Sequence, residues 1–272
     1  MQGKGAFSDV VRSVADEPSG MRPDAVQAFE RVAVVQKPYS FEHVVEIEDE
    51  PRHHLVVENE FVRAFAVEVG PHDRTLCHRH NHDYLTYVAS IADIISAPQD
   101  KTPETHLYYD GQCELSPAGM VHVVENLTDA KFRNILLEFL PKAADLRRGP
   151  DPRLNGGFAS IRLRLDSDRV SVYRLSMLRS AQVEISGPAI LASPYEQEVE
   201  LEELGGGTVK LRGFRDLAWL RPLGNGLVRN TGSRSAWVIV LQLGASDEQL
   251  SSVRKQEQEP LKILRVHAEK PK

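Results

Sequence analysis

Cysteine is scarce in this sequence, and long apolar runs are absent from it. Two cysteines, Cys77 and Cys113, occur in 272 residues, too few for the disulfide framework of a small secreted protein. No run approaches the roughly 18 apolar residues of a membrane span, and residues 1–38 contain no apolar run of the secretory type. We therefore expect a cytoplasmic protein with no membrane partner.

An excess of basic residues is also missing. The chain has 33 Lys and Arg against 39 Asp and Glu, a formal net charge of −6, and a pI near 5.9. Proteins that bind nucleic acids usually present a basic face, so we expect no nucleic-acid partner. A hydrophobic content of 41% over 272 residues suffices for two cores, and this length favours two domains.

Histidine is concentrated in one part of the chain, and none occurs between His122 and His267. His78 and His80 form a His-x-His pair among strand-forming residues. Side chains two residues apart on a strand point to the same face. His122 follows a Pro-x-Gly turn and supplies a third imidazole. Three imidazoles that converge from two strands predict a metal site formed by His78, His80 and His122.

The spacing of these residues resembles the two sequence motifs of the cupin family. The second motif, Gly-x5-Pro-x-Gly-x2-His-x3-Asn, is matched at every fixed position, by Gly111, Pro117, Gly119, His122 and Asn126. The first, Gly-x5-His-x-His-x3or4-Glu-x6-Gly, is matched in part: Gly70 lies two residues too far from His78, Tyr84 and Leu85 occupy the place of the glutamate ligand, and the closing glycine is missing. The resemblance covers residues 59–139 and implies an antiparallel jelly-roll barrel, a double-stranded β-helix, whose mouth holds a metal.

The second half of the chain repeats the first. Residues 126–139 align without gaps on residues 230–243, and this alignment pairs Leu137 with Leu241. We interpret the chain as an all-β bicupin, because an internal repeat of domain length is stronger evidence than either barrel alone.

The second copy lacks the histidines. Asn225 or Gly226 stands where the histidine of the second motif belongs. A barrel without imidazole or cysteine does not build a site for a borderline metal, although Glu196 and Glu198 are a weaker alternative. We expect the second barrel to cover the first or to carry an oligomer interface.

Changes in composition predict five segments. Residues 1–40 are an N-terminal extension with a short helix over residues 23–35, and residues 41–140 are the metal-binding cupin domain. Residues 141–158, rich in Pro and Gly, are a linker. Residues 159–245 are the degenerate cupin domain, and residues 246–272 are a charged tail that begins with a short helix. Because exposed sheet edges promote association, we expect either pairing of the barrels within one chain or a homodimer.

Several polar residues near the motifs are candidates for substrate contact. Arg63 shares a strand face with Phe65; it either reaches the barrel interior and binds a substrate carboxylate or lies at the rim. Tyr84 is expected to face inward beside the metal and to act as a hydrogen-bond donor. His53 and His54, near a proline, are expected in a solvated turn.

The sequence leaves two alternatives for each of two further pairs of residues. His82 and Asp83 fall between strands and either support the metal ligands or form a polar hairpin tip. His106 and Tyr108 share a strand face that is directed either into the pocket or outward.

Three neutral histidine ligands leave coordination positions open, which suits Fe(II), with Ni, Mn, Co or Zn as alternatives. The family resemblance then implies a mononuclear non-haem iron oxygenase that acts on a small organic molecule. A non-redox isomerase or lyase that uses Tyr84 as a general acid or base is one alternative. A non-catalytic, small-molecule-binding or regulatory cupin is the other, because this fold hosts many functions.

Overall fold

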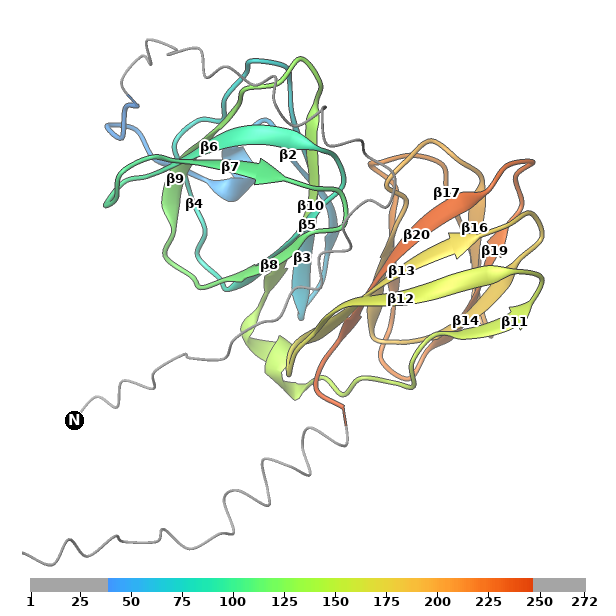
Figure 1. Cartoon of the computed structure of the whole chain (residues 1–272). Coiled ribbons are helices and arrows are strands. Elements are labelled where there is room, and N and C mark those ends of the chain that lie inside the picture. The colour runs from blue at the N-terminus through green and yellow to red at the C-terminus, as the bar shows by residue number, and fades with distance from the viewer. Residues whose placement is uncertain (1–38, 247–272) are drawn as a thin grey trace, which may run out of the picture.

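The computed structural model describes residues 39–246 as two β-barrels, the first drawn in blue to green and the second in yellow to red (Figure 1). The helices expected over residues 23–35 and after Ser246 lie outside the described residues. Within the described part, no helix combines the length and the apolar character needed to cross a membrane. Cys77 and Cys113 are buried free thiols.

The first barrel consists of two five-stranded sheets. One sheet pairs, in spatial order, β1 (Val45–Glu46), β4 (His78–Arg79), β9 (Val121–Asn126), β6 (Ala92–Pro98) and β7 (Glu104–Tyr108). The other pairs β2 (His53–Glu58), β3 (Val62–Val69), β10 (Phe132–Phe139), β5 (Tyr84–Val88) and β8 (Cys113–Ser116). A 3-10 turn, η2 (Ile47–Asp49), lies between β1 and β2. Since the chain alternates between the sheets from β7 to β10, the barrel is a jelly roll.

The second barrel repeats this arrangement. Its first sheet pairs β11 (Arg153–Gly156), β14 (Gln182–Ser186), β19 (Asn225–Asn230), β16 (Val199–Glu203) and β17 (Thr208–Leu211). Its second sheet pairs β12 (Ala159–Asp166), β13 (Val170–Met177), β20 (Ala236–Leu243), β15 (Ala189–Ala192) and β18 (Leu217–Leu220). The segment predicted as a linker, residues 141–158, contains a 3-10 helix, η3 (Pro141–Asp145), and also β11, which pairs with β14.

The internal repeat is visible in the hydrogen bonds as well as in the strands. Strands β10 and β20 are related by the same residue offset as the sequence alignment. Asn126 donates a side-chain hydrogen bond to the carbonyl of Val69 at the end of β3, and Asn230 donates one to the carbonyl of Met177 at the end of β13. The matched asparagines therefore hold equivalent corners of the two barrels.

A continuous apolar layer joins the two barrels. The outward faces of β3, β5 and β10 pack against those of β13, β15 and β20. This layer contains Ala64, Ala66, Leu85, Leu137, Val172, Ile190, Ile239 and Leu241, all fully buried. Strands β3, β10, β13 and β20 consequently carry apolar residues on both faces, because both faces are largely shielded from water. The barrels thus pair within one chain, the first of the two arrangements expected.

Ion pairs and hydrogen bonds surround this apolar layer. Asp110 of the first barrel accepts hydrogen bonds from Arg174 Nη2 at 2.8 Å and from the Tyr195 hydroxyl at 2.7 Å. Asp83 accepts one from Arg169 Nη1 at 2.5 Å. The carboxylates of Asp110 and Asp83 therefore fix the orientation of one barrel on the other.

Candidate metal centre

Strands β4 and β9 bring the three motif histidines together. His78 is the direct antiparallel partner of His122, and His80 follows one residue after the end of β4. The ligand-capable nitrogens of the three rings lie within 4.8 Å of one another. The convergence that the sequence predicted for these side chains is therefore present in the fold.

The geometry of the three rings fits a divalent metal ion. His80 Nε2 and His122 Nε2 lie 3.2 Å apart, and two nitrogens bound to one ion at 2.0–2.1 Å are themselves about 3–3.4 Å apart. His78 Nε2 and His80 Nδ1 are buried and have no hydrogen-bond partner among residues 39–246. An unpaired buried polar atom is unfavourable. A metal ion at the point where the rings meet would be the missing partner of His78 Nε2.

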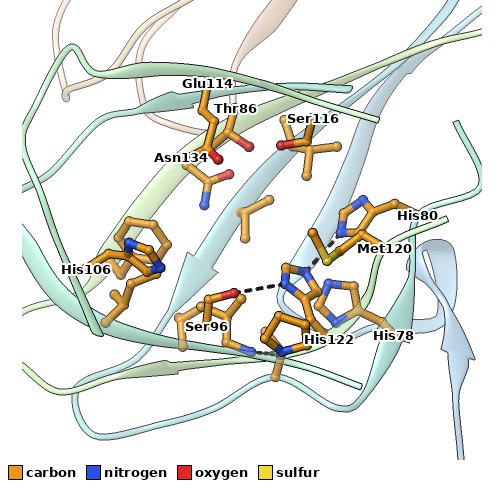
Figure 2. A pocket seen from close by; sticks show the side chains of 18 of the residues that line it. His78, His80, Thr86, Ser96, His106, Glu114, Ser116, Met120, His122 and Asn134 are labelled. Atoms are coloured by element: carbon orange, nitrogen blue, oxygen red, sulfur yellow. Dashed lines mark hydrogen bonds between the residues drawn. The ribbon is translucent and has the colours of Figure 1, made fainter. Parts of the chain in front are cut away.

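Hydrogen bonds on the far side of two rings fix which nitrogen faces this point. His78 Nδ1 lies 2.9 Å from the carbonyl oxygen of Leu76, so this nitrogen carries the proton and donates it. His122 Nδ1 lies 3.5 Å from Ser96 Oγ, as Figure 2 shows. This leaves the Nε2 lone pairs of His78 and His122 directed at the centre, the arrangement that metal-ligating histidines adopt.

Burial keeps the three imidazoles neutral. It lowers the pKa of His78 to about 4, and the neighbouring His53 contributes in the same direction. Burial likewise lowers the pKa of His80 and of His122 far below the ordinary range, with further contributions from the other rings of the cluster. Because a histidine must be unprotonated to bind a metal, all three are ready to do so at neutral pH.

A fourth histidine, His53, lies beside this cluster, and the expectation of a solvated turn was wrong. His53 is a buried residue of β2 whose ring centroid is 4.7 Å from that of His78. Its Nδ1 lies 2.7 Å from Oε2 of Glu50, a fully buried carboxylate that also accepts hydrogen bonds from the backbone amides of Arg52 and Leu76. His54 is half-buried on the same strand. The physical reason is Glu50, which makes an inward-facing polar ring at position 53 favourable.

A cavity of about 290 Å³ extends from the histidines into the first barrel. Its lining includes Tyr84 and Thr86 of β5 and His106 and Tyr108 of β7. The inward orientation expected for Tyr84 is therefore found and Thr86 shares it, and His106 and Tyr108 face the pocket. Burial raises the pKa of Tyr84 to about 12, so its hydroxyl is protonated at neutral pH.

Arg63 does not line this cavity. Its guanidinium is held by Glu138, with Nη2 2.6 Å from Oε2, and by Glu48. Glu138 is fully buried and is the cross-strand partner of both Arg63 and Tyr84. Arg63 thus lies inside the barrel, one of the two positions expected, but there it neutralises protein carboxylates. His82 and Asp83 also lie outside the cavity lining.

Asn134 and Glu114 are among the polar residues of the cavity that the sequence argument missed. Asn134 lies on β10 between Phe132 and Leu136 of the same face, and Glu114 belongs to the edge strand β8. A polar residue within a strand that is otherwise buried on both faces is a signal that could have identified Asn134.

The second barrel has an apolar core where the equivalent site would be. Gly226 occupies the position of His122, and a Cβ atom at Gly226 would lie 2.7 Å from Leu201 Cδ1. Leu201 and Leu220 are buried in the apolar core of this barrel. Glu196 and Glu198 belong to no group of three metal-ligating side chains among residues 39–246.

Comparisons with known proteins identify the fold. No family model and no curated protein matches the chain. Among solved structures, the vicilin from Capsicum annuum has a TM-score of 0.52 and 11% identity, over 68% of this chain and 76% of that chain. The vicilin from tomato gives 0.52 and 11%, over 68% and 75%. An oxalate decarboxylase gives 0.50 and 10%, over 71% and 72%. With its two repeated jelly-roll barrels, the chain therefore has the bicupin fold.

Proposed function

We propose that the first barrel binds one divalent metal ion through His78, His80 and His122 and that, with Fe(II), it oxygenates a small organic molecule. The observation that carries this proposal is the set of three neutral imidazoles facing a cavity, with two Nε2 atoms 3.2 Å apart and His78 Nε2 unpaired. Among residues 39–246, no carboxylate joins this group. Fe(II), when bound, supplies open coordination positions and the electrons that activate dioxygen.

The protein around the centre contributes orientation and a proton. Tyr84, whose raised pKa keeps its hydroxyl protonated, lines the cavity next to His80 and serves as a hydrogen-bond donor to a bound substrate. The cavity also restricts the access of water to a substrate held beside the histidines.

Non-redox chemistry is the second candidate. A protonated Tyr84 beside a Lewis-acidic ion such as Zn²⁺ is the arrangement that an isomerase or lyase requires. A third candidate is a binding protein without catalysis. The vicilin from Solanum melongena has different anionic ligands in structurally similar pockets, and a comparable role is open to this cavity.

Metal analysis followed by oxygen uptake tests the proposal. Protein purified without chelator is analysed for metals, then loaded anaerobically with Fe(II) and supplied with small acids, diketones and thiols. Iron in the protein and oxygen consumption that depends on one substrate class support the oxygenase. Zinc or nickel with substrate conversion but no oxygen uptake supports the isomerase or lyase, and ligand binding without conversion supports the binding protein. Glu198→Ala, a substitution in the second barrel, is the control that should behave as wild type.

A further inference from the structure

The cavity of the first barrel has a second polar region, remote from the histidines. Figure 2 shows Glu114, Thr86 and Asn134 grouped together on the opposite side of the pocket from His78 and His122. These side chains come from three neighbouring strands, β8, β5 and β10. We call Glu114 and Asn134 the distal wall.

One amide atom of Asn134 lacks a hydrogen-bond partner among residues 39–246. Its residue is 6% exposed, and its Oδ1 atom is buried without a hydrogen bond among the described residues. A buried amide atom that forms no hydrogen bond is unfavourable. Phe132 and Leu136, which share this face of β10, are apolar, and Asn134 lines the cavity, so a ligand is the group that would satisfy the amide.

Glu114 gives the distal wall a negative charge. Its Oε2 accepts a hydrogen bond from the Tyr108 hydroxyl at 3.1 Å, which orients the carboxylate across the gap between the edge strands β8 and β7. Within residues 39–246, Glu114 forms no ion pair with a lysine, arginine or histidine, although Lys101 also lines the cavity. A carboxylate has about four lone-pair sites, so Glu114 can accept further hydrogen bonds from a ligand.

We propose that the distal wall binds the ammonium group of a small bifunctional substrate whose other end, a carboxylate or a similar donor, is directed at the histidines. Charge complementarity with Glu114 and the unsatisfied amide of Asn134 support an ammonium at this end. A cavity of about 290 Å³ limits the ligand to a small molecule, since ligand pockets usually have volumes of about 300–1,000 Å³. This inference adds a substrate class to the proposed function. It rests on the proposed function for the end of the substrate that is directed at the histidines.

Matched pairs of ligands test the distal wall by calorimetric titration. The probes are glycine, β-alanine, 4-aminobutanoate and 5-aminopentanoate. Each is compared with the alkanoate in which a methyl group replaces the ammonium, using both the Zn²⁺-loaded and the metal-free protein. We expect at least one amino acid to bind about tenfold more tightly than its isostere, the effect of one charge-assisted hydrogen bond. Equal affinity, or no measurable binding, for both members of every pair would overturn the inference.

Two substitutions show where the preference arises. Glu114→Gln keeps the size of the side chain and removes its charge, so the preference should fall to about one, and Asn134→Leu should weaken it. Glu196→Gln removes an exposed charge in the second barrel and should leave the preference unchanged. A preference that persists in Glu114→Gln contradicts the assignment.

The same titrations separate the distal wall from the metal centre. In the metal-free protein and in His80→Ala, the preference for the ammonium compound should persist at lower absolute affinity, because Glu114 acts without the metal. Failure of the protein to bind metal while the preference persists would refute the proposed metal function alone. Normal metal binding without any preference would refute the distal wall alone.

Discussion

The ring of Tyr84 stacks on the ring of His80, with centroids 4.1 Å apart and an angle of 18° between the planes. Tyr84 stands where the cupin motif has a glutamate ligand. In place of a negatively charged oxygen, the site has an aromatic ring that holds one histidine in position and a hydroxyl that remains protonated. Position 84 thus affects the metal through the orientation of His80 and through the charge that the protein supplies.

Tyr84→Phe should retain the metal, because phenylalanine preserves the stack on His80. It should lower substrate affinity or turnover by about tenfold, the effect of one lost hydrogen bond to a substrate. Metal content and steady-state kinetics, measured on the same preparations, check both parts. An empty site in Tyr84→Phe would show that the phenol oxygen is a ligand. Tyr84→Glu should bind metal more tightly and occupy a position that the reaction needs.

His80→Ala should reduce bound metal by at least about tenfold while the barrel stays folded, since metal affinity depends on the number of correctly placed ligands. His122→Ala should have the same effect. Elemental analysis together with circular dichroism checks this, with Glu198→Ala as the matched control. Wild-type metal content in His80→Ala would remove this histidine from the site.

Arg63→Leu should lower the free energy of unfolding by roughly 3–5 kcal/mol, because it leaves the buried carboxylate of Glu138 without its partner. The double substitution Arg63→Leu with Glu138→Leu should recover much of this loss. Urea unfolding measures both effects, and metal content should remain unchanged in each variant. Loss of metal or of ligand binding in the stable double variant would instead assign Arg63 a direct role at the site.

Glu50 should make stability depend on pH in the acid range. Burial acts to raise its pKa, but the hydrogen bond from His53 and the backbone amides of Arg52 and Leu76 outweigh burial, and the pKa of Glu50 is lowered. A carboxyl whose pKa is lower in the folded state stabilises that state above its unfolded pKa, near ~4.3, and this stabilisation is lost as the pH falls through the folded value.

Glu50→Gln should therefore be less stable than wild type by a constant amount between pH 7 and pH 5, and the difference should narrow below about pH 4.3. Urea unfolding at several pH values measures it, with the exposed Glu58→Gln as the control. A difference between wild type and Glu50→Gln that does not change with pH would contradict the assigned pKa shift.

The two barrels should unfold as one unit, because their shared apolar layer is buried from both sides. Leu241→Ala, in the second barrel, should cost roughly 2–5 kcal/mol and should lower the temperature at which the first barrel releases its metal. Calorimetry should show a single transition. Leu163→Ala, at an exposed position on β12, is the control. Two separate transitions, with the first barrel unaffected by Leu241→Ala, would show that the barrels are independent.

Features of the site that depend on local spacing could be predicted from the sequence. His78 and His80 are two residues apart on one segment, and His122 follows its own turn, so each orientation follows from a few neighbouring residues. The second barrel was also predictable, because residues 126–139 and 230–243 carry the same apolar pattern without a gap.

Features that depend on contacts between distant strands could not be predicted in this way. Arg63 is matched with Glu138 through the register of β3 and β10, 75 residues apart. His53 is buried because its hydrogen-bond partner Glu50, at the end of η2, is itself buried. No local sequence pattern predicts the burial of Glu50. Glu114 and Asn134 meet in the cavity only when β8, β5 and β10 pair.

The surroundings of Gly226 determine how readily the second barrel could accept a histidine at the position equivalent to His122. A Cβ atom at position 226 would lie 2.7 Å from Leu201 Cδ1, so a histidine there requires the Leu201 side chain to move. A histidine at position 226 would also place a polar ring in the apolar core that contains Leu201 and Leu220, which is unfavourable unless the ring finds a partner. The two halves of the chain, similar in backbone, are therefore unequal hosts for a metal site: the first barrel has three histidines beside a cavity, whereas in the second a single new histidine would cost stability before further ligands joined it.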